Sequence, residues 1–172
     1  MEEKKRPEAV DLAWKLWLAV VAGECLHQIL NVVTGFFGIG EVKQAARESM
    51  NSQQLEMLSE AQLTTIAGFA LIIAGLIAMT VMVVVAWTAR TFLKGGPKAE
   101  GSRRFLTFFA AYFAFRGVFV FELALTSTVP LALVLSDGIA QLLVAVLAVL
   151  AALFGGKKES VEWARATPAE TP

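Results

Sequence analysis

Residues 64–87 read TTIAGFALIIAGLIAMTVMVVVAW, a run without a single charged side chain. An α-helix of about 20 apolar residues crosses the roughly 30 Å hydrocarbon core of a bilayer, and this run exceeds that length. Only helices and closed barrels satisfy their backbone groups inside lipid, and the short alternating segments of a barrel are absent here. The run therefore predicts a membrane-spanning helix over residues 60–90.

The rest of the chain repeats this pattern. A hydrophobic content of 56% and a mean hydropathy of +0.62 exceed what a soluble domain of 172 residues can hide. Three further long apolar segments occupy residues 12–37, 105–128 and 130–154. Together the four segments predict an all-α, integral membrane four-helix bundle over residues 12–156. Residues 1–11 form its N-terminal flank, and residues 157–172 form a tail that we expect to be disordered at its end.

Local signals mark the helix boundaries. Ser59 and Gln62 fit a capping box, so the second helix is expected to start near Ser59. Pro130 suits a first helical turn, where a missing N–H costs nothing. The link between the third and fourth segments is so short that these two helices must be antiparallel neighbours. Because Glu24 interrupts the first segment and no small-residue cleavage site follows, we expect that segment to be retained rather than removed as a signal peptide.

The distribution of Lys and Arg predicts the orientation. Cytoplasmic loops of membrane proteins carry an excess of these residues. They gather in the N-terminal flank, the middle loop and the tail, whereas the first loop has only Lys43 and Arg47. We therefore expect a multi-pass protein of the bacterial cytoplasmic (inner) membrane with both termini in the cytoplasm. The first loop is rich in helix formers and predicts a short amphipathic helix on the outer interface. A docking site for an extracytoplasmic partner is the alternative interpretation of this loop.

The first segment contains GECLHQILN at residues 23–31, which is unusually polar for a membrane span. Glu24, His27, Gln28 and Asn31 have the spacing of one stripe along a helix. Because lipid does not solvate such groups, we expect the stripe to face the interior of the bundle.

The other segments contain partners for this stripe. Arg116 lies roughly 16 Å into the third segment, near the bilayer centre, and an Arg there keeps its charge. Glu24 lies at a comparable depth and is the expected partner, with Tyr112 one turn from Arg116 as a stacking or hydrogen-bonding neighbour. The remaining polar residues of the predicted intramembrane core are Glu122, Asp137 and Gln141. Because neighbouring helices are antiparallel, these polar residues all lie between the middle of the membrane and its outer face. We therefore expect the core to be open toward the outside, with Arg116 as its deepest residue, or floor.

Two interpretations of the polar core stay open at this point. Polar contacts between membrane helices are common structural features, each contributing about 0.6 kcal/mol on average. We interpret Glu122 and Asp137 as shallow structural residues and His27 as a hydrogen-bonded packing residue. For Glu24 and Arg116, a structural ion pair and a ligand site are equally compatible with the sequence.

The sequence contains no motif for catalysis or for a cofactor. It has no phosphate-binding glycine loop, nucleophile elbow, CxxC or haem-attachment motif. A single His without a second ligand at helical spacing does not predict a metal site. Equal numbers of acidic and basic residues, 15 each, do not indicate a nucleic-acid partner. We therefore expect a non-enzymatic protein without cofactor or metal.

The stretch RPEAVDLAWKLWLAVVAG resembles the start of small four-span membrane proteins of actinobacteria, which are of uncharacterised function. The resemblance is carried by Arg6, Pro7, Val10, Ala13, Leu16 and Trp17, and it covers about the first twenty residues. It implies an inner-membrane location and a four-span topology, and it brings no catalytic residues.

Two functional hypotheses follow. The first is an accessory or assembly subunit that binds a larger membrane protein complex of the cell envelope or respiratory chain. The second is a small carrier or ligand-binding membrane protein that uses the intramembrane Glu, Arg, His and Asp core, with proton-linked transport as one form. A homo-oligomer is compatible with the second hypothesis.

Overall fold

In the computed structural model, which describes residues 5–120 and 130–166, every regular element is a helix. The helices are α1 (Glu8–Phe37), α2 (Ile39–Ser49), α3 (Ser52–Glu56), α4 (Glu60–Lys94), α5 (Ala99–Val118), α6 (Leu131–Gly155) and α7 (Lys158–Arg165). The prediction of an all-helical chain is confirmed for these residues.

Among the described residues, three helices are long and apolar enough to cross a membrane, namely α1, α4 and α6. Helix α5 contains the first part of the third predicted span, and residues 121–128 of that span lie outside the described residues. Helix α5 starts six residues before the apolar run at Phe105, in a stretch that contains Glu100, Arg103 and Arg104. These charges make α5 less apolar than the other long helices.

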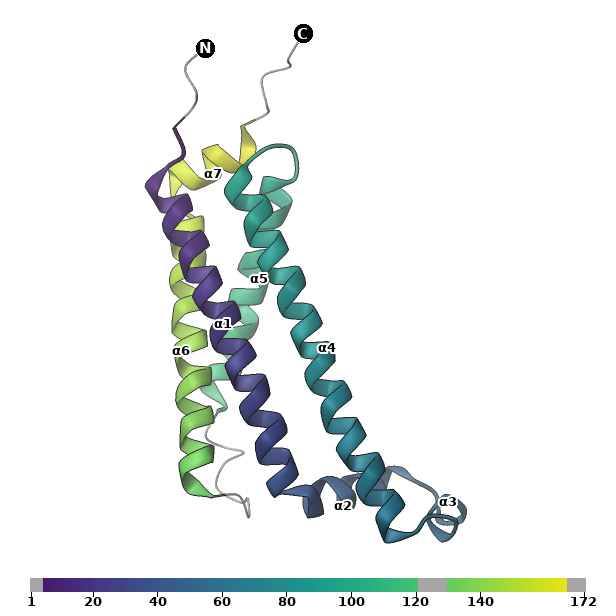
Figure 1. The fold of residues 1–172 in the computed structure, drawn as a ribbon. Coiled ribbons are helices and arrows are strands. Elements are labelled where there is room, and N and C mark those ends of the chain that lie inside the picture. The colour runs from purple at the N-terminus through teal and green to yellow at the C-terminus, as the bar shows by residue number, and fades with distance from the viewer. Residues whose placement is uncertain (1–4, 121–129, 167–172) are drawn as a thin grey trace.

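The four long helices pack side by side (Figure 1). Helix α1 contacts α6 and α4, and α5 contacts the same two helices. Helices α1 and α5 have little direct backbone contact, so they lie across the interior from one another. The start of α1, the end of α4, the start of α5 and the end of α6 lie at one end with α7, while α2 and α3 lie at the opposite end (Figure 1).

The apolar core lies in the half of the molecule nearest α7. Its largest fully buried side chains are Trp17, Phe92 and Phe113. Around them pack buried residues of every long helix and of α7: Val10, Ala13, Val20, Met82, Val85, Ala89, Ala99, Leu106, Ala110, Val144, Ala148, Ala151 and Ala164. Between helices that lie in lipid, close van der Waals packing of such side chains, rather than their removal from water, favours association.

Two of the predicted boundaries can be compared with the structure. The capping box at Ser59 is confirmed, because its side chain accepts a hydrogen bond from the backbone N–H of Gln62 and the Gln62 side chain accepts one from the backbone N–H of Ser59. Pro130 directly precedes α6 as its N-cap residue, one position before the expected first turn.

Helix α7 was not predicted, since the sequence after residue 156 reads as a tail. Ser160 is fully buried, and its hydroxyl donates to the backbone carbonyl of Phe154 at 2.8 Å. The indole Nε1 of Trp163 donates to the carbonyl of Phe92 at 3.3 Å. Each of these carbonyls also accepts a backbone N–H, that of Gly95 for Phe92 and that of Lys157 for Phe154. The side-chain bonds therefore add a second donor to each carbonyl and attach α7 to the ends of α4 and α6.

The same end carries a cluster of charges around Glu100. Arg103 and Arg104 donate to its carboxylate from one turn along α5, and Arg165 of α7 lies 3.7 Å from it. The hydrogen bond from Arg103 is the main cause that lowers the pKa of Glu100 to about 2, and Arg104 adds to the effect. Glu100 therefore keeps its negative charge among these cations throughout the physiological pH range.

The turn between α4 and α5 generates a stability prediction. Gly95 has a φ of 74°, and an added Cβ would lie 3.1 Å from the Trp163 ring. Gly95→Ala should therefore lower the free energy of unfolding by at least ~1 kcal/mol. Gly101 lies in α5 with nothing within 4 Å of an added Cβ, so Gly101→Ala should raise it by up to ~1 kcal/mol. Thermal unfolding in detergent, followed by circular dichroism, measures both. Equal effects of the two changes would contradict the assigned backbone conformation of Gly95.

Candidate functional site

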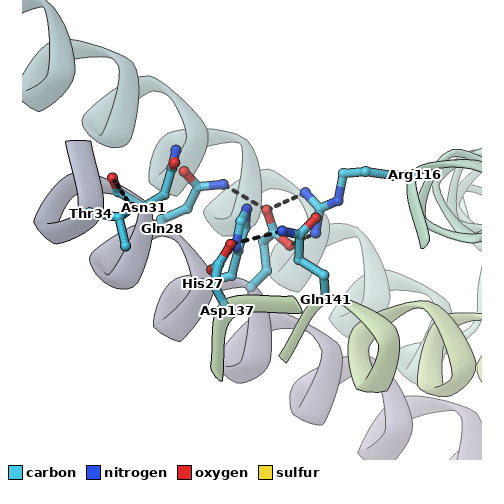
Figure 2. A network of polar contacts seen from close by, with 8 residues as sticks. His27, Gln28, Asn31, Thr34, Arg116, Asp137 and Gln141 are labelled. Carbon is cyan, nitrogen blue, oxygen red and sulfur yellow. Dashed lines mark hydrogen bonds and ion pairs between the residues drawn. The ribbon is translucent and has the colours of Figure 1, made fainter. Parts of the chain in front are cut away.

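Three of the four residues of the predicted polar stripe of α1 are buried, and the fourth is exposed. Glu24, His27 and Gln28 are each less than a tenth exposed, whereas Asn31 lies farther toward α2 and is exposed. Figure 2 shows His27 directed toward Asp137 of α6, whereas Asn31 lies apart from the residues of α5 and α6. Regular helix geometry places all of them on one face.

The deepest contact joins α1 to α5. Arg116 donates from Nη1 to Glu24 Oε1 at 2.7 Å and from Nη2 to Glu24 Oε2. The amide of Gln28 donates to Glu24 Oε1 at 2.7 Å (Figure 2). A guanidinium matches a carboxylate with two parallel hydrogen bonds, which is a strong and directional arrangement. The structure therefore brings together the two residues that the sequence pairs by depth alone.

Two aromatic rings contact the Arg116 guanidinium. Its Cζ lies 5.9 Å from the centroid of Tyr112 and 5.2 Å from that of Phe113. Such distances permit attraction between a cation and the negative face of a ring. The contact with Tyr112 was expected from its position one turn away, and that with Phe113 was not.

A second group of contacts joins α1 to α6. His27 Nδ1 lies 2.5 Å from Asp137 Oδ1, and the Gln141 amide donates to Asp137 Oδ2 at 2.9 Å (Figure 2). An ionised carboxylate only accepts hydrogen bonds, so His27 donates through Nδ1. From the sequence we interpreted Asp137 as a shallow structural residue, and the structure pairs it with His27. The contact between Asp137 and His27 depends on how α1 and α6 are rotated about their own axes. The spacing of residues along each helix does not determine that rotation.

These six side chains form what we call the polar network: Glu24, His27, Gln28, Arg116, Asp137 and Gln141. Within the part of the chain that the structure describes, no fully buried side-chain polar atom lacks a hydrogen-bond partner. No group of three or more His, Cys, Asp or Glu residues among the described positions is arranged to hold a metal ion. Glu122, the remaining predicted core residue, lies outside the described residues.

A cavity of about 680 Å³ adjoins the polar network on the side of α2, and we call it the polar cavity. Its lining includes Asn31 and Tyr112 together with four network residues, His27, Arg116, Asp137 and Gln141. Its other lining residues are Thr34, Gly35, Gly38, Glu41, Val42, Leu71, Phe115, Phe119, Val120, Val134 and Gly138. The volume falls within the ~300–1,000 Å³ range of small-molecule sites, and the mixture of apolar walls with a few converging polar groups is typical of them.

A smaller cavity of about 300 Å³ lies between α4 and α5, and we call it the side cavity. Its walls are apolar residues of these two helices: Ala78, Val81, Met82, Phe108, Phe109 and Phe113. Glu24 and Gln28 form its polar part, and Tyr112 and Arg116 line both cavities. The side cavity and the polar cavity therefore meet the polar network at the same two side chains of α5.

No protein-family model, curated protein or solved structure matches the chain.

The Glu24–Arg116 contact predicts strong energetic coupling. Removing one member of a buried ion pair leaves the other uncompensated, at a typical cost of ~3–5 kcal/mol, whereas replacing both by apolar residues can be nearly neutral. Glu24→Leu or Arg116→Leu alone should therefore lower the thermal stability of the purified protein, and the double variant should recover much of the loss.

The exposed pair Arg47 and Glu60 offers a matched control, because its charges are already solvated. The corresponding Leu changes there should alter stability little, singly or together. Additive losses in the Glu24 and Arg116 double variant would show that the two side chains do not stabilise one another.

Proposed function

We propose that this chain is a four-span membrane protein that binds a small organic ligand in the polar cavity, as a carrier or ligand-binding protein. The observation that carries the proposal is the polar cavity itself, which has the charged polar network as its floor. The proposal favours the second of the two hypotheses drawn from the sequence.

Four spans follow if α5 and the remainder of the predicted segment at residues 105–128 cross the membrane beside α1, α4 and α6. The packing of α5 between α4 and α6 supports this arrangement. The distribution of cations supports a cytoplasmic location for the α7 end, which holds Arg90, Lys94, Lys98, Arg103, Arg104, Lys157, Lys158 and Arg165. The N-terminal resemblance to actinobacterial four-span proteins supports a bacterial inner membrane.

The contrast between the two halves of the molecule supports a functional polar network. Near α7, the same four helices pack through a core of apolar side chains, so folding does not require polar groups between them. Ionisable residues inside a membrane are costly and are typically kept where they contact a ligand, an ion or a proton. The polar network lines a cavity that a ligand can enter, and this fits that rule better than a network fully surrounded by packed side chains would.

An accessory subunit remains the second candidate because of the surface of α5. Five aromatic residues spaced three and four apart are exposed, four of them in α5 and the last at its C-cap: Phe105, Phe108, Tyr112, Phe115 and Phe119. Residues at this spacing form one stripe of a helix, and such a stripe fits a helix of a larger membrane complex as well as it fits lipid.

The proposed topology places both termini in the cytoplasm. A reporter fused after residue 172 should be active only in its cytoplasmic form, and one inserted between residues 45 and 55 only in its external form. The opposite pattern at either position would overturn the orientation.

The ligand proposal predicts stabilisation by a small molecule. A ligand that binds only the folded protein raises the unfolding free energy by about 2.7 kcal/mol at a hundredfold excess over its dissociation constant. We expect at least one class in a library of small organic cations, anions and neutral solutes to raise the unfolding temperature, followed by circular dichroism. Asn31→Trp, which fills the polar cavity, should abolish the shift. Leu26→Trp, on an exposed face of the same helix, should retain it.

If no class stabilises the protein, the ligand proposal fails. A pull-down in mild detergent that recovers one stoichiometric membrane partner, lost when Phe108 and Phe115 are changed to Ala, would then support the accessory subunit. Recovery of the partner by both forms would argue against the aromatic stripe as its binding surface.

A further inference from the structure

We propose that the ligand is an amphiphile with a cationic head, which binds its head in the polar cavity beside Asp137 and its apolar body in the side cavity. This inference rests on the proposed function and specifies the chemical class of its ligand. It follows from three observations: the charge balance of the polar network, the aromatic lining of the polar cavity, and the position of the side cavity.

The charge balance favours a cation. Both terminal nitrogens of Arg116 already donate to Glu24, so these two charges cancel. Asp137 interacts with His27 and with the uncharged Gln141. Among the described residues no Arg or Lys pairs with Asp137, and its carboxylate lines the polar cavity. An anionic ligand would have to compete with Glu24 for Arg116, whereas a cation would meet Asp137 directly.

The aromatic lining suits the same charge. Tyr112, Phe115 and Phe119 line the polar cavity together with Asp137. The faces of aromatic rings attract alkylammonium groups, and this attraction strengthens when the cation is removed from water. A carboxylate combined with several rings is thus a suitable environment for an amine or a quaternary ammonium.

The side cavity suits an apolar body attached to that head. The side chains of Tyr112 and Arg116 line both cavities and so stand between them, and with Arg116 held by Glu24, a ligand that occupies both cavities would pass beside the Tyr112 ring. On the outer side of the side cavity, Val81 is 37% exposed and Phe108 is 70% exposed, so this cavity reaches the surface between α4 and α5. In the proposed membrane orientation that surface faces the hydrocarbon region, where an alkyl chain is already soluble.

Equilibrium binding of radiolabelled decyltrimethylammonium tests the inference. The full chain is placed in phosphatidylcholine nanodiscs, and partitioning into empty nanodiscs is subtracted. We expect saturable binding that unlabelled decyltrimethylammonium displaces. Tetramethylammonium, which has the head without the chain, and decyl sulfate, which has the chain with an anionic head, should displace little at tenfold higher concentration.

Two pairs of variants locate the head and the chain. Asp137→Asn should weaken binding at least about tenfold, because it removes the charge that faces the cation. Asp11→Asn removes an exposed carboxylate near the α7 end and should leave the affinity unchanged. Val81→Trp obstructs the side cavity and should also weaken binding, whereas Val83→Trp, 68% exposed on the same helix, should not. Thermal unfolding of each variant shows whether it remains folded.

Each contrary outcome identifies what fails. Equal displacement by tetramethylammonium would overturn the role of the side cavity and leave a head-only ligand in the polar cavity, as the proposed function allows. Equal displacement by decyl sulfate, or full affinity in Asp137→Asn, would overturn the assignment of a cationic head. Absence of saturable binding would overturn the amphiphile as a class. The library experiment with Asn31→Trp decides separately whether the polar cavity binds any ligand.

Discussion

An arginine among packed helices cannot release its proton, so the structure around Arg116 has to supply a negative charge at a fixed place. Glu24 supplies it from α1, across the interior from α5. Because α1 and α5 have little direct backbone contact, the long arginine side chain bridges the distance between them. The pair therefore sets how α1 and α5 stand relative to one another along their lengths. A lysine would not substitute for Arg116, because the planar guanidinium has two terminal nitrogens that donate in parallel to the two carboxylate oxygens of Glu24.

The same constraint divides the interior into two parts. On the α7 side of the pair, Trp17, Phe92 and Phe113 fill the space between the four helices. On the α2 side, the polar side chains of His27, Asp137 and Gln141 contact one another and line the polar cavity instead of filling it. A core of large apolar residues on both sides would pack more tightly and would hold no ligand. The polar cavity thus depends on the residues on the α2 side of the ion pair, whereas the residues on the α7 side form most of the buried apolar core.

The sequence is sufficient to predict features that depend on a single helix or on the depth of a residue along a membrane-spanning helix. Glu24 and Arg116 could be paired because each residue advances a helix by a constant rise and because a buried charge needs a partner. His27 and Asp137 could not be paired, since their contact requires knowing that α1 and α6 are neighbours and how each is rotated. Helix α7 was missed because its stabilising bonds reach carbonyls of Phe92 and Phe154 in other helices. The cavities were also beyond prediction, since they depend on the packing of side chains from several helices.

The surfaces that the two candidate functions use overlap on α5. Of the exposed aromatic stripe, Phe115 and Phe119 also line the polar cavity and Phe108 lines the side cavity, but only Tyr112 lines both. Tyr112 contacts Arg116, lines both cavities, and belongs to the exposed aromatic stripe of α5. Anything that packs against this stripe, whether lipid or a partner helix, restricts the positions that the Tyr112 ring can occupy. Because the ring also contacts the guanidinium and lines both cavities, a ligand inside the helices and whatever packs on the outer face of α5 would each contact this one side chain.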